Sequence, residues 1–175
     1  MAWRSYRAAA RLLDQWAHDE LELRCDLLIA AGEVGMRGSR ADEARGLLME
    51  AIETARSRGW AERLCRAVLA YTFRAYIISA SETETIALLE EALAGLAPNA
   101  ETASLRARVL SRLALEKRYA SSDGLDDALE LIDGAIQLAR DVGDAGGLPR
   151  ARAAGTVVRG RSRAPQRGIE HNNQI

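Results

Sequence analysis

The sequence predicts an all-α chain folded as an α-solenoid, in which antiparallel helix pairs stack in a row. Composition is the first of three observations that predict this class. Aromatic residues make up 5% of the 175 residues and only three prolines interrupt the chain, while Ala, Leu, Glu and Arg dominate; most of these residues lose little entropy in a helix. Apolar residues also recur with the helical period of 3.6 rather than the strand period of 2. Finally, one short pattern returns three times, as in proteins built from repeated helix pairs.

The recurring pattern is a small residue, a large aliphatic residue four positions later, and Ala three positions after that. Its copies are Ala44/Leu48/Ala51, Thr85/Leu89/Ala92 and Ala128/Ile132/Ala135, which lie 41 and 43 residues apart. Small residues two turns apart let two helices approach closely, and the aliphatic residue between them fills the remaining space. Each copy therefore predicts the second helix of a pair.

A first helix is expected about one helix length upstream of each copy, because a repeat of this length holds two helices. The predicted first helices span residues 21–37, 62–79 and 104–120, where apolar residues follow the helical period. One more helix is expected before them, from Trp3 to Trp16. A short one is expected after them, from Leu148 to Val158, with Pro149 in its first turn. A closed bundle of the same helices is the alternative architecture.

Residues at the ends of the predicted helices support these boundaries. Ser39 and Ser81 are each followed three residues later by an acid, which is typical of a capped helix start. Gly59 and Gly143 each follow a helical run and are expected to adopt the left-handed conformation that ends many helices.

The helical pattern stops near Gly155, and charge changes in the same region. Residues 150–175 contain six Arg and one Glu, whereas the whole chain has a net charge of −1. We therefore expect a helical repeat domain over residues 1–154 and a basic, disordered tail over residues 155–175. Such a tail is usually a solvated terminus, although it could also contact nucleic acid or an acidic neighbour.

The sequence contains no motif for catalysis or cofactor binding. The phosphate-loop motif G-x-x-x-x-G-K-S/T is absent. Gly32, Gly35 and Gly38 follow no predicted strand, so we interpret them as positions of close helix packing and a turn. Adjacent acids such as Glu90 and Glu91 lie on predicted exposed faces, whereas acid–base catalysis needs carboxylates held across a cleft. We predict that the chain is not an enzyme and uses no cofactor.

The cysteines and histidines do not predict a metal site. A zinc site needs about four converging ligands, and Cys25, Cys65, His18 and His171 show none of the short spacings that arrange them. The two cysteines fall at equivalent positions of neighbouring predicted helices, which places them beyond the reach of a disulfide. We expect two buried, reduced thiols. With no apolar leader and no membrane-length apolar run, the expected location is the cytoplasm.

The repeats resemble tetratricopeptide units, whose second helix carries a small residue, a large residue and then Ala. Gly32 matches the small residue of the first helix, but Phe73 and Glu116 stand at that position in the later repeats. The closing proline is absent, and the repeats are longer than the standard ~34 residues. The resemblance implies about three degenerate repeats with a flanking N-terminal helix.

Residues 1–154 also resemble the helical region of large ATP-binding transcriptional regulators of the LuxR family. The stretches 25–33, 41–45 and 135–144 are similar in style to that region. In those regulators such helices lie between a nucleotide-binding module and a DNA-binding helix-turn-helix, and no residues here match either part. The resemblance implies a truncated or split member of the family.

These observations together predict a scaffold that binds a protein or peptide in a concave groove. By analogy with the tetratricopeptide groove, the residues expected to face it are Asp26, Ile29, Glu33, Arg37, Ala70, Arg74, Ile77, Leu113 and Lys117. Self-association through the ends of the array is also expected. An effector-sensing segment of a transcription factor is the alternative function. Nucleic-acid binding through the Arg-rich tail is the least favoured, and direct DNA binding is not expected.

Overall fold

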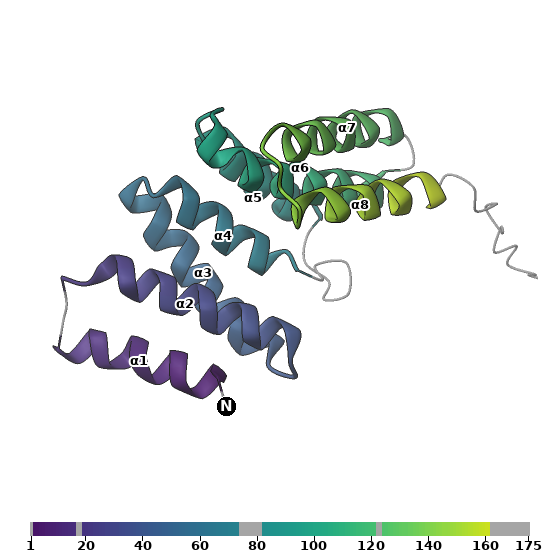
Figure 1. The fold of residues 1–175 in the computed structure, drawn as a ribbon. Coiled ribbons are helices and arrows are strands. Elements are labelled where there is room, and N and C mark those ends of the chain that lie inside the picture. The colour runs from purple at the N-terminus through teal and green to yellow at the C-terminus, as the bar shows by residue number, and fades with distance from the viewer. Residues whose placement is uncertain (1, 17–18, 74–81, 122–123, 162–175) are drawn as a thin grey trace, which may run out of the picture.

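A computed structural model of the chain describes residues 2–16, 19–73, 82–121 and 124–161 (Figure 1). Within these ranges the chain forms eight helices and no strand. The helices are α1 (Ala2–Trp16), α2 (Leu21–Arg37), α3 (Ala41–Arg58), α4 (Ala61–Tyr71), α5 (Glu82–Gly95), α6 (Ala100–Ala120), α7 (Leu125–Asp141) and α8 (Gly147–Arg161). The all-helical class predicted from the sequence is confirmed.

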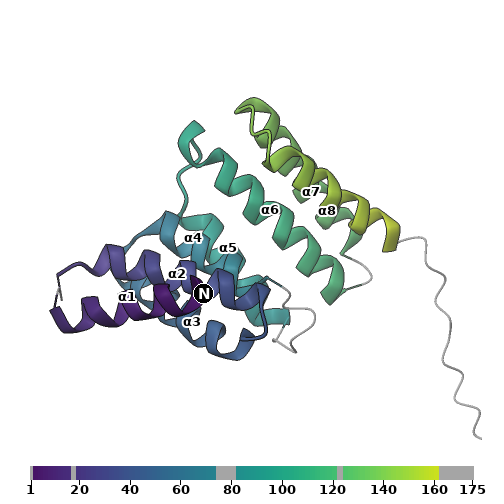
Figure 2. The ribbon, with the colours of Figure 1, turned by 60° about the horizontal axis from the view of Figure 1, so that its bottom comes forward.

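Each helix packs against the next one along the chain, and a second set of contacts joins alternate helices. Helix α2 contacts α4, α4 contacts α6, and α6 contacts α8. Helix α3 contacts both α2 and α4, and α5 contacts both α4 and α6. Figure 2 shows α7 and α8 lying side by side along α6. The even-numbered helices therefore form one continuous series of neighbours.

The recurring small–large–small pattern lies in α3, α5 and α7, and all of it is buried. None of its nine residues is more than 1% exposed. Gly32 of α2 explains why one partner helix must carry a small residue: a Cβ added there would lie 2.3 Å from Leu48 Cγ. Glycine at this point lets α2 and α3 approach more closely than any other residue would.

The two cysteines occupy equivalent places in successive helix pairs. The Cys25 thiol donates to the Ala51 carbonyl at 3.7 Å, and the Cys65 thiol donates to the Ala92 carbonyl at 3.0 Å. Both thiols are free and buried, as predicted. Burial is the main cause that raises the pKa of both, to about 12 for Cys65. In the third pair Ala107 packs beside Ala135, so the position stays small without a thiol.

The apolar core is unequal along the chain. One large buried cluster extends from α1 to α6. Two smaller clusters, built mainly from alanines, hold α6, α7 and α8 together. The C-terminal helices therefore depend on close approach of small side chains more than on large apolar ones.

Two predicted boundaries were wrong. Helix α4 ends at Tyr71 and is capped by Thr72, not near residue 79; residues 74–81 lie outside the described ranges. The sequence after Tyr71 is rich in β-branched and aromatic residues, which are poor helix formers. Helix α3 begins at Ala41, and its cap position is Arg40 without a side-chain cap, so Ser39 does not cap it. Gly59 and Gly143 do adopt positive φ angles of 67° and 64°.

The predicted start of the tail at residue 155 was also wrong, because α8 continues to Arg161. Val158 is fully buried, and Gly155 lies so close to α7 that an added Cβ would be 2.9 Å from Ile132 Cγ2. Packing against α7 thus outweighs the low helix propensity of Gly and Val. Residues 162–175 lie outside the described ranges.

Candidate functional site

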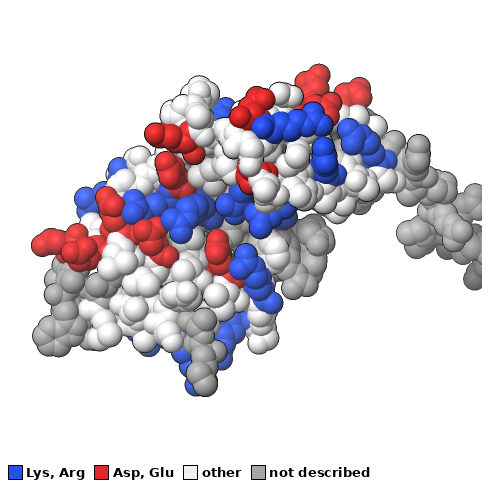
Figure 3. All heavy atoms as spheres, viewed as in Figure 1, with Lys and Arg blue, Asp and Glu red and all other residues white. Residues whose placement is uncertain are grey.

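A cleft of about 370 Å³ lies between α4, α6 and α8, with the end of α2 at one side. A smaller hollow of about 80 Å³ adjoins it and shares several of its residues. The cleft is lined by Arg37, Leu69, Phe73, Arg108, Ser111, Arg112, Leu115, Gly147, Arg150 and Ala154. Glu33, Met36 and Ala70 line the hollow in addition. Figure 3 shows Lys and Arg side chains gathered in a band across this face of the molecule.

Three helices supply the arginines of this arginine-lined cleft: α2, α6 and α8. Arg37 is the last residue of α2, and Arg150 lies near the start of α8. Arg108 and Arg112 are four residues apart in α6, so they share one face of that helix. These positions are distant in sequence and meet only because α2, α4, α6 and α8 are successive neighbours.

The beginning of α8, which carries Arg150, is fixed by Asp144. Its carboxylate accepts the backbone N–H groups of Gly146 at 3.0 Å and Gly147 at 2.7 Å, and the hydroxyl of Ser104 in α6. These hydrogen bonds, led by that of Ser104, lower the pKa of Asp144. The cap therefore ties α8 to α6 at the mouth of the cleft.

The arginines of the cleft differ in how their charge is balanced. Arg112 lies 3.0 Å from Glu116, whose side chain is buried. Arg37 lies over the Phe73 ring at 5.9 Å. By contrast, neither Arg108 nor Arg150 forms a hydrogen bond or ion pair with any residue that the structure describes. Two guanidinium groups in the cleft thus lack a partner within the described chain.

Arg108 is the least favourably placed of these cations. It is half-buried, and its pKa is lowered first by burial and then by the neighbouring charge of Arg150. Glu33 and Asp144 act in the opposite direction, and Arg66 adds to the repulsion. Cations held together and partly out of water are a hallmark of sites that bind an anion.

The cleft also offers apolar surface. Leu69 and Leu115 are half-buried, and Phe73 is 40% exposed. Among the described residues that line the cleft and its hollow, Glu33 is the one acid against four arginines. The arrangement suits a ligand that combines negative charge with an apolar group.

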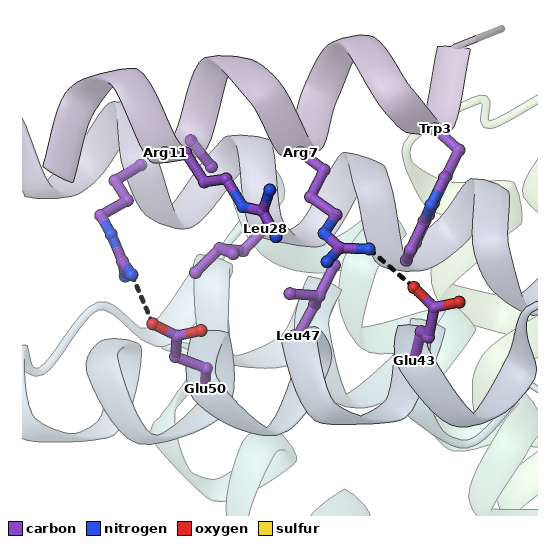
Figure 4. A pocket seen from close by; sticks show the side chains of 9 residues that line it. Trp3, Arg7, Arg11, Leu28, Glu43, Leu47 and Glu50 are labelled. Atoms are coloured by element: carbon purple, nitrogen blue, oxygen red, sulfur yellow. Dashed lines mark hydrogen bonds and ion pairs between the residues drawn. The ribbon is translucent and has the colours of Figure 1, made fainter. Parts of the chain in front are cut away.

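A second cleft, of about 350 Å³, lies between α1, α2 and α3 (Figure 4). Trp3, Leu28 and Leu47 point into it. Two of its three arginines are paired with acids of α3: Arg7 donates to Glu43 at 2.7 Å, and Arg24 forms an ion pair with Glu50. This α1–α3 cleft resembles the other in size and differs from it in charge balance.

The structure places only part of the predicted groove at the arginine-lined cleft. Glu33 and Arg37 lie there, and Ala70 lines the adjoining hollow. Arg74 and Ile77 lie outside the described residues. Leu113 is only 3% exposed, so it is a core residue.

The other predicted groove residues form packing contacts or ion pairs between helices. Ile29 is fully buried, so its assignment as a binding residue was wrong; its position on α2 faces the core. Asp26 accepts from Arg63 at 3.0 Å and from Arg66 at 2.9 Å, which joins α2 to α4. Lys117 pairs with Glu90 at 2.8 Å, which joins α6 to α5.

Sequence reasoning missed the central residues of the cleft, Arg108, Arg112 and Arg150. The i, i+4 spacing of the first two was a visible signal for a basic helix face. Nothing in the local sequence indicates that Arg150 joins them, because that depends on the contact between α6 and α8.

Metal and membrane features were also sought in the described residues. Nowhere in those ranges do three or more His, Cys, Asp or Glu side chains gather in a way that could hold a metal ion. None of the eight helices described combines the length and apolarity needed to cross a bilayer.

Comparison with known proteins found no match to this chain among protein-family models, curated proteins or solved structures.

Proposed function

We propose that this chain is a tetratricopeptide-like helical-repeat scaffold that binds a segment of a partner protein. Three stacked pairs, α2–α3, α4–α5 and α6–α7, would form the array, with α1 and α8 flanking it. Support comes from the regular contacts between alternate helices and from the burial of the same three pattern positions in each second helix. Repeats of this kind present the first helices of their pairs as an extended binding face.

The observation that carries the proposal is the arginine-lined cleft on the face of α2, α4, α6 and α8. Elsewhere, interhelical arginines meet acids across the packed helices, for example in the bidentate contact of Arg56 with Glu91 at 2.6 and 2.8 Å. At the cleft two arginines are held together without such a partner. A surface that keeps uncompensated charge beside exposed apolar groups is typical of a binding site rather than of a structural contact.

The test is affinity capture with the immobilised full chain, comparing wild type with Arg150→Glu. Arg150 is exposed, so reversal of its charge is expected to leave the fold intact. Captured partners should be lost from the variant. Arg58→Glu is the matched control, because Arg58 is an exposed arginine of α3 that does not line the cleft. Partners retained equally by all three proteins would contradict binding at this face.

We also propose that the scaffold belongs to a LuxR-type regulator, on the basis of the resemblance in residues 1–154. The second candidate role of the scaffold is the sensing of a small effector. One observation favours it: the cleft volume of about 370 Å³ falls within the range of small-molecule sites. A screen of anionic metabolites by thermal shift separates the two roles. Stabilisation by a small molecule that is lost in Arg150→Glu would support the sensor.

A further inference from the structure

We infer that the arginine-lined cleft recognises an acidic peptide segment in which carboxylates flank an apolar side chain. Arg108 and Arg150 would hold the carboxylates, and Leu69 and Phe73 would contact the apolar side chain. This inference rests on the proposed function, and it adds the chemistry of the partner.

The positive charges of Arg108 and Arg150 are only partly balanced within the described chain. Arg108 is half-buried beside Arg150, and neither forms an ion pair with a described residue, although the charges of Glu33 and Asp144 partly offset the repulsion at Arg108. A ligand carboxylate placed between them would remove the repulsion and could accept two N–H groups from one guanidinium. The free protein therefore holds an arrangement that becomes favourable only when an anion is bound.

The form of the anion follows from what surrounds the arginines. The apolar wall of Leu69, Phe73 and Leu115 lies next to Arg108 in the same cleft. A peptide can supply an apolar side chain and a carboxylate on neighbouring residues, which matches this juxtaposition. A free inorganic anion would make no use of the apolar surface of Leu69, Phe73 and Leu115.

The charges of neighbouring helices disfavour a nucleic acid. Helix α5 carries four acids and no basic residue, and α7 carries five acids and one Arg. These helices contact α6, and α7 also contacts α8. On the face that holds the cleft, Figure 3 shows acidic side chains beside and between the basic ones, whereas nucleic-acid binders present a continuous basic surface.

Neutralising Glu33 tests whether the cleft binds an anion. Within the described lining it is the one acid, and its charge reaches Arg108. Its carboxylate competes with an incoming anion for the same cation. Neutralising Glu33 should therefore strengthen binding of an acidic peptide, while neutralising Arg108 or Arg150 should weaken it.

The experiment selects random dodecapeptides displayed on phage against the immobilised full chain. We expect enrichment of sequences in which Asp or Glu neighbours Leu or Phe. The best selected peptide is then labelled with fluorescein and titrated by anisotropy. Arg108→Gln and Arg150→Gln should each weaken its binding about tenfold or more, since each removes a charge-assisted contact. Glu33→Gln should tighten binding by a few fold, and Arg58→Gln should change nothing.

Several results would overturn the assignment. The cleft does not recognise acidic peptides if the selection enriches basic or uncharged sequences, or enriches none. The same conclusion follows if the affinity of the selected peptide does not change with salt concentration. If a single-stranded oligonucleotide binds more tightly than the selected peptide, the natural ligand carries phosphate groups and the acidic-peptide assignment is wrong. Circular dichroism of each variant identifies any that unfold, and exposed Arg150 keeps the test valid if Arg108→Gln does so. If capture of partners is still lost in Arg150→Glu while the selected peptides are not acidic, the scaffold function is retained and only the proposed chemistry of the ligand is wrong.

Discussion

The α1–α3 cleft and the arginine-lined cleft have similar volumes and both contain arginines, yet their charges are arranged in opposite ways. In the first, Arg7 and Arg24 each meet a glutamate of α3. In the second, Arg108 and Arg150 form no ion pair with a described residue, and Glu33 and Asp144 offset the charge of Arg108 only in part. Paired charges at a helix junction define how helices pack, whereas unpaired charges held together leave an interaction for a ligand to complete. Charge balance, and not size, therefore distinguishes the arginine-lined cleft, the proposed binding site, from the α1–α3 cleft.

The largest expected effect is on ligand binding at the arginine-lined cleft. The double change Arg108→Gln and Arg150→Gln should reduce affinity for an acidic peptide about a hundredfold or more, because a charge-assisted contact is lost at two positions. The free energy of unfolding should stay the same or rise slightly, since the cationic repulsion disappears. Anisotropy and urea denaturation measure the two effects. A large loss of stability would show that these arginines are structural after all.

The next effect tests the packing of α1, which closes the other cleft. At Gly35 an added Cβ would lie 2.6 Å from Trp3 Cζ3 and 2.7 Å from Ala44 Cβ. Gly35→Ala should lower the free energy of unfolding by about 1–3 kcal/mol, as overpacking does in a well-packed core. Gly46→Ala in α3 is the control: nothing lies within 4 Å of its added Cβ, so the same change should be neutral or stabilising by up to about 1 kcal/mol. Equal effects in urea titrations would contradict the close approach of α1.

A smaller effect is expected at Asp144, which holds the α8 wall of the arginine-lined cleft. Its lowered pKa means that its stabilising contribution is present above the ordinary carboxyl pKa of about 3.9 and is lost as pH falls through the folded value. Asp144→Ala should cost about 1 kcal/mol at pH 7, the usual value of a helix cap. The difference from wild type should shrink toward pH 3. A difference that is constant from pH 7 to pH 3 would rule out the charged cap.

The smallest effect is expected when a paired arginine of the α1–α3 cleft is neutralised. Arg7 and Glu43 are both largely exposed at their contact, and such pairs contribute less than about 1 kcal/mol. Arg7→Gln should therefore change the urea midpoint only slightly and leave peptide affinity unaltered. Reduced affinity in this variant would mean that both clefts take part in binding.

Sequence reasoning identified helices well where period and pattern agreed. Helix α2 matches its predicted range of residues 21–37, and the three pattern copies fall in buried positions. It did less well where a helix end depends on packing. Helix α4 was expected to extend to residue 79 but ends at Tyr71, and α8 was expected to end at Val158 but continues to Arg161.

The candidate site was predicted only in part. Of the residues assigned to the groove, Glu33 and Arg37 line the hollow beside the cleft, whereas Ile29 points into the core. A helical period shows which residues share a face, and it does not show which of two packed faces turns toward a groove.

The sequence by itself determined that this chain is helical, where most helices lie, and which small residues their contacts need, because these depend on local propensity and on a period of a few residues. Tertiary structure alone decided that Arg108 and Arg150, 42 residues apart in the sequence, lie in one cleft and that neither forms an ion pair with an acid of the described chain. The reason is physical: the electrostatic environment of a side chain is set by groups close in space. Those groups come from α2, α4, α6 and α8, which become neighbours only when the helices pack.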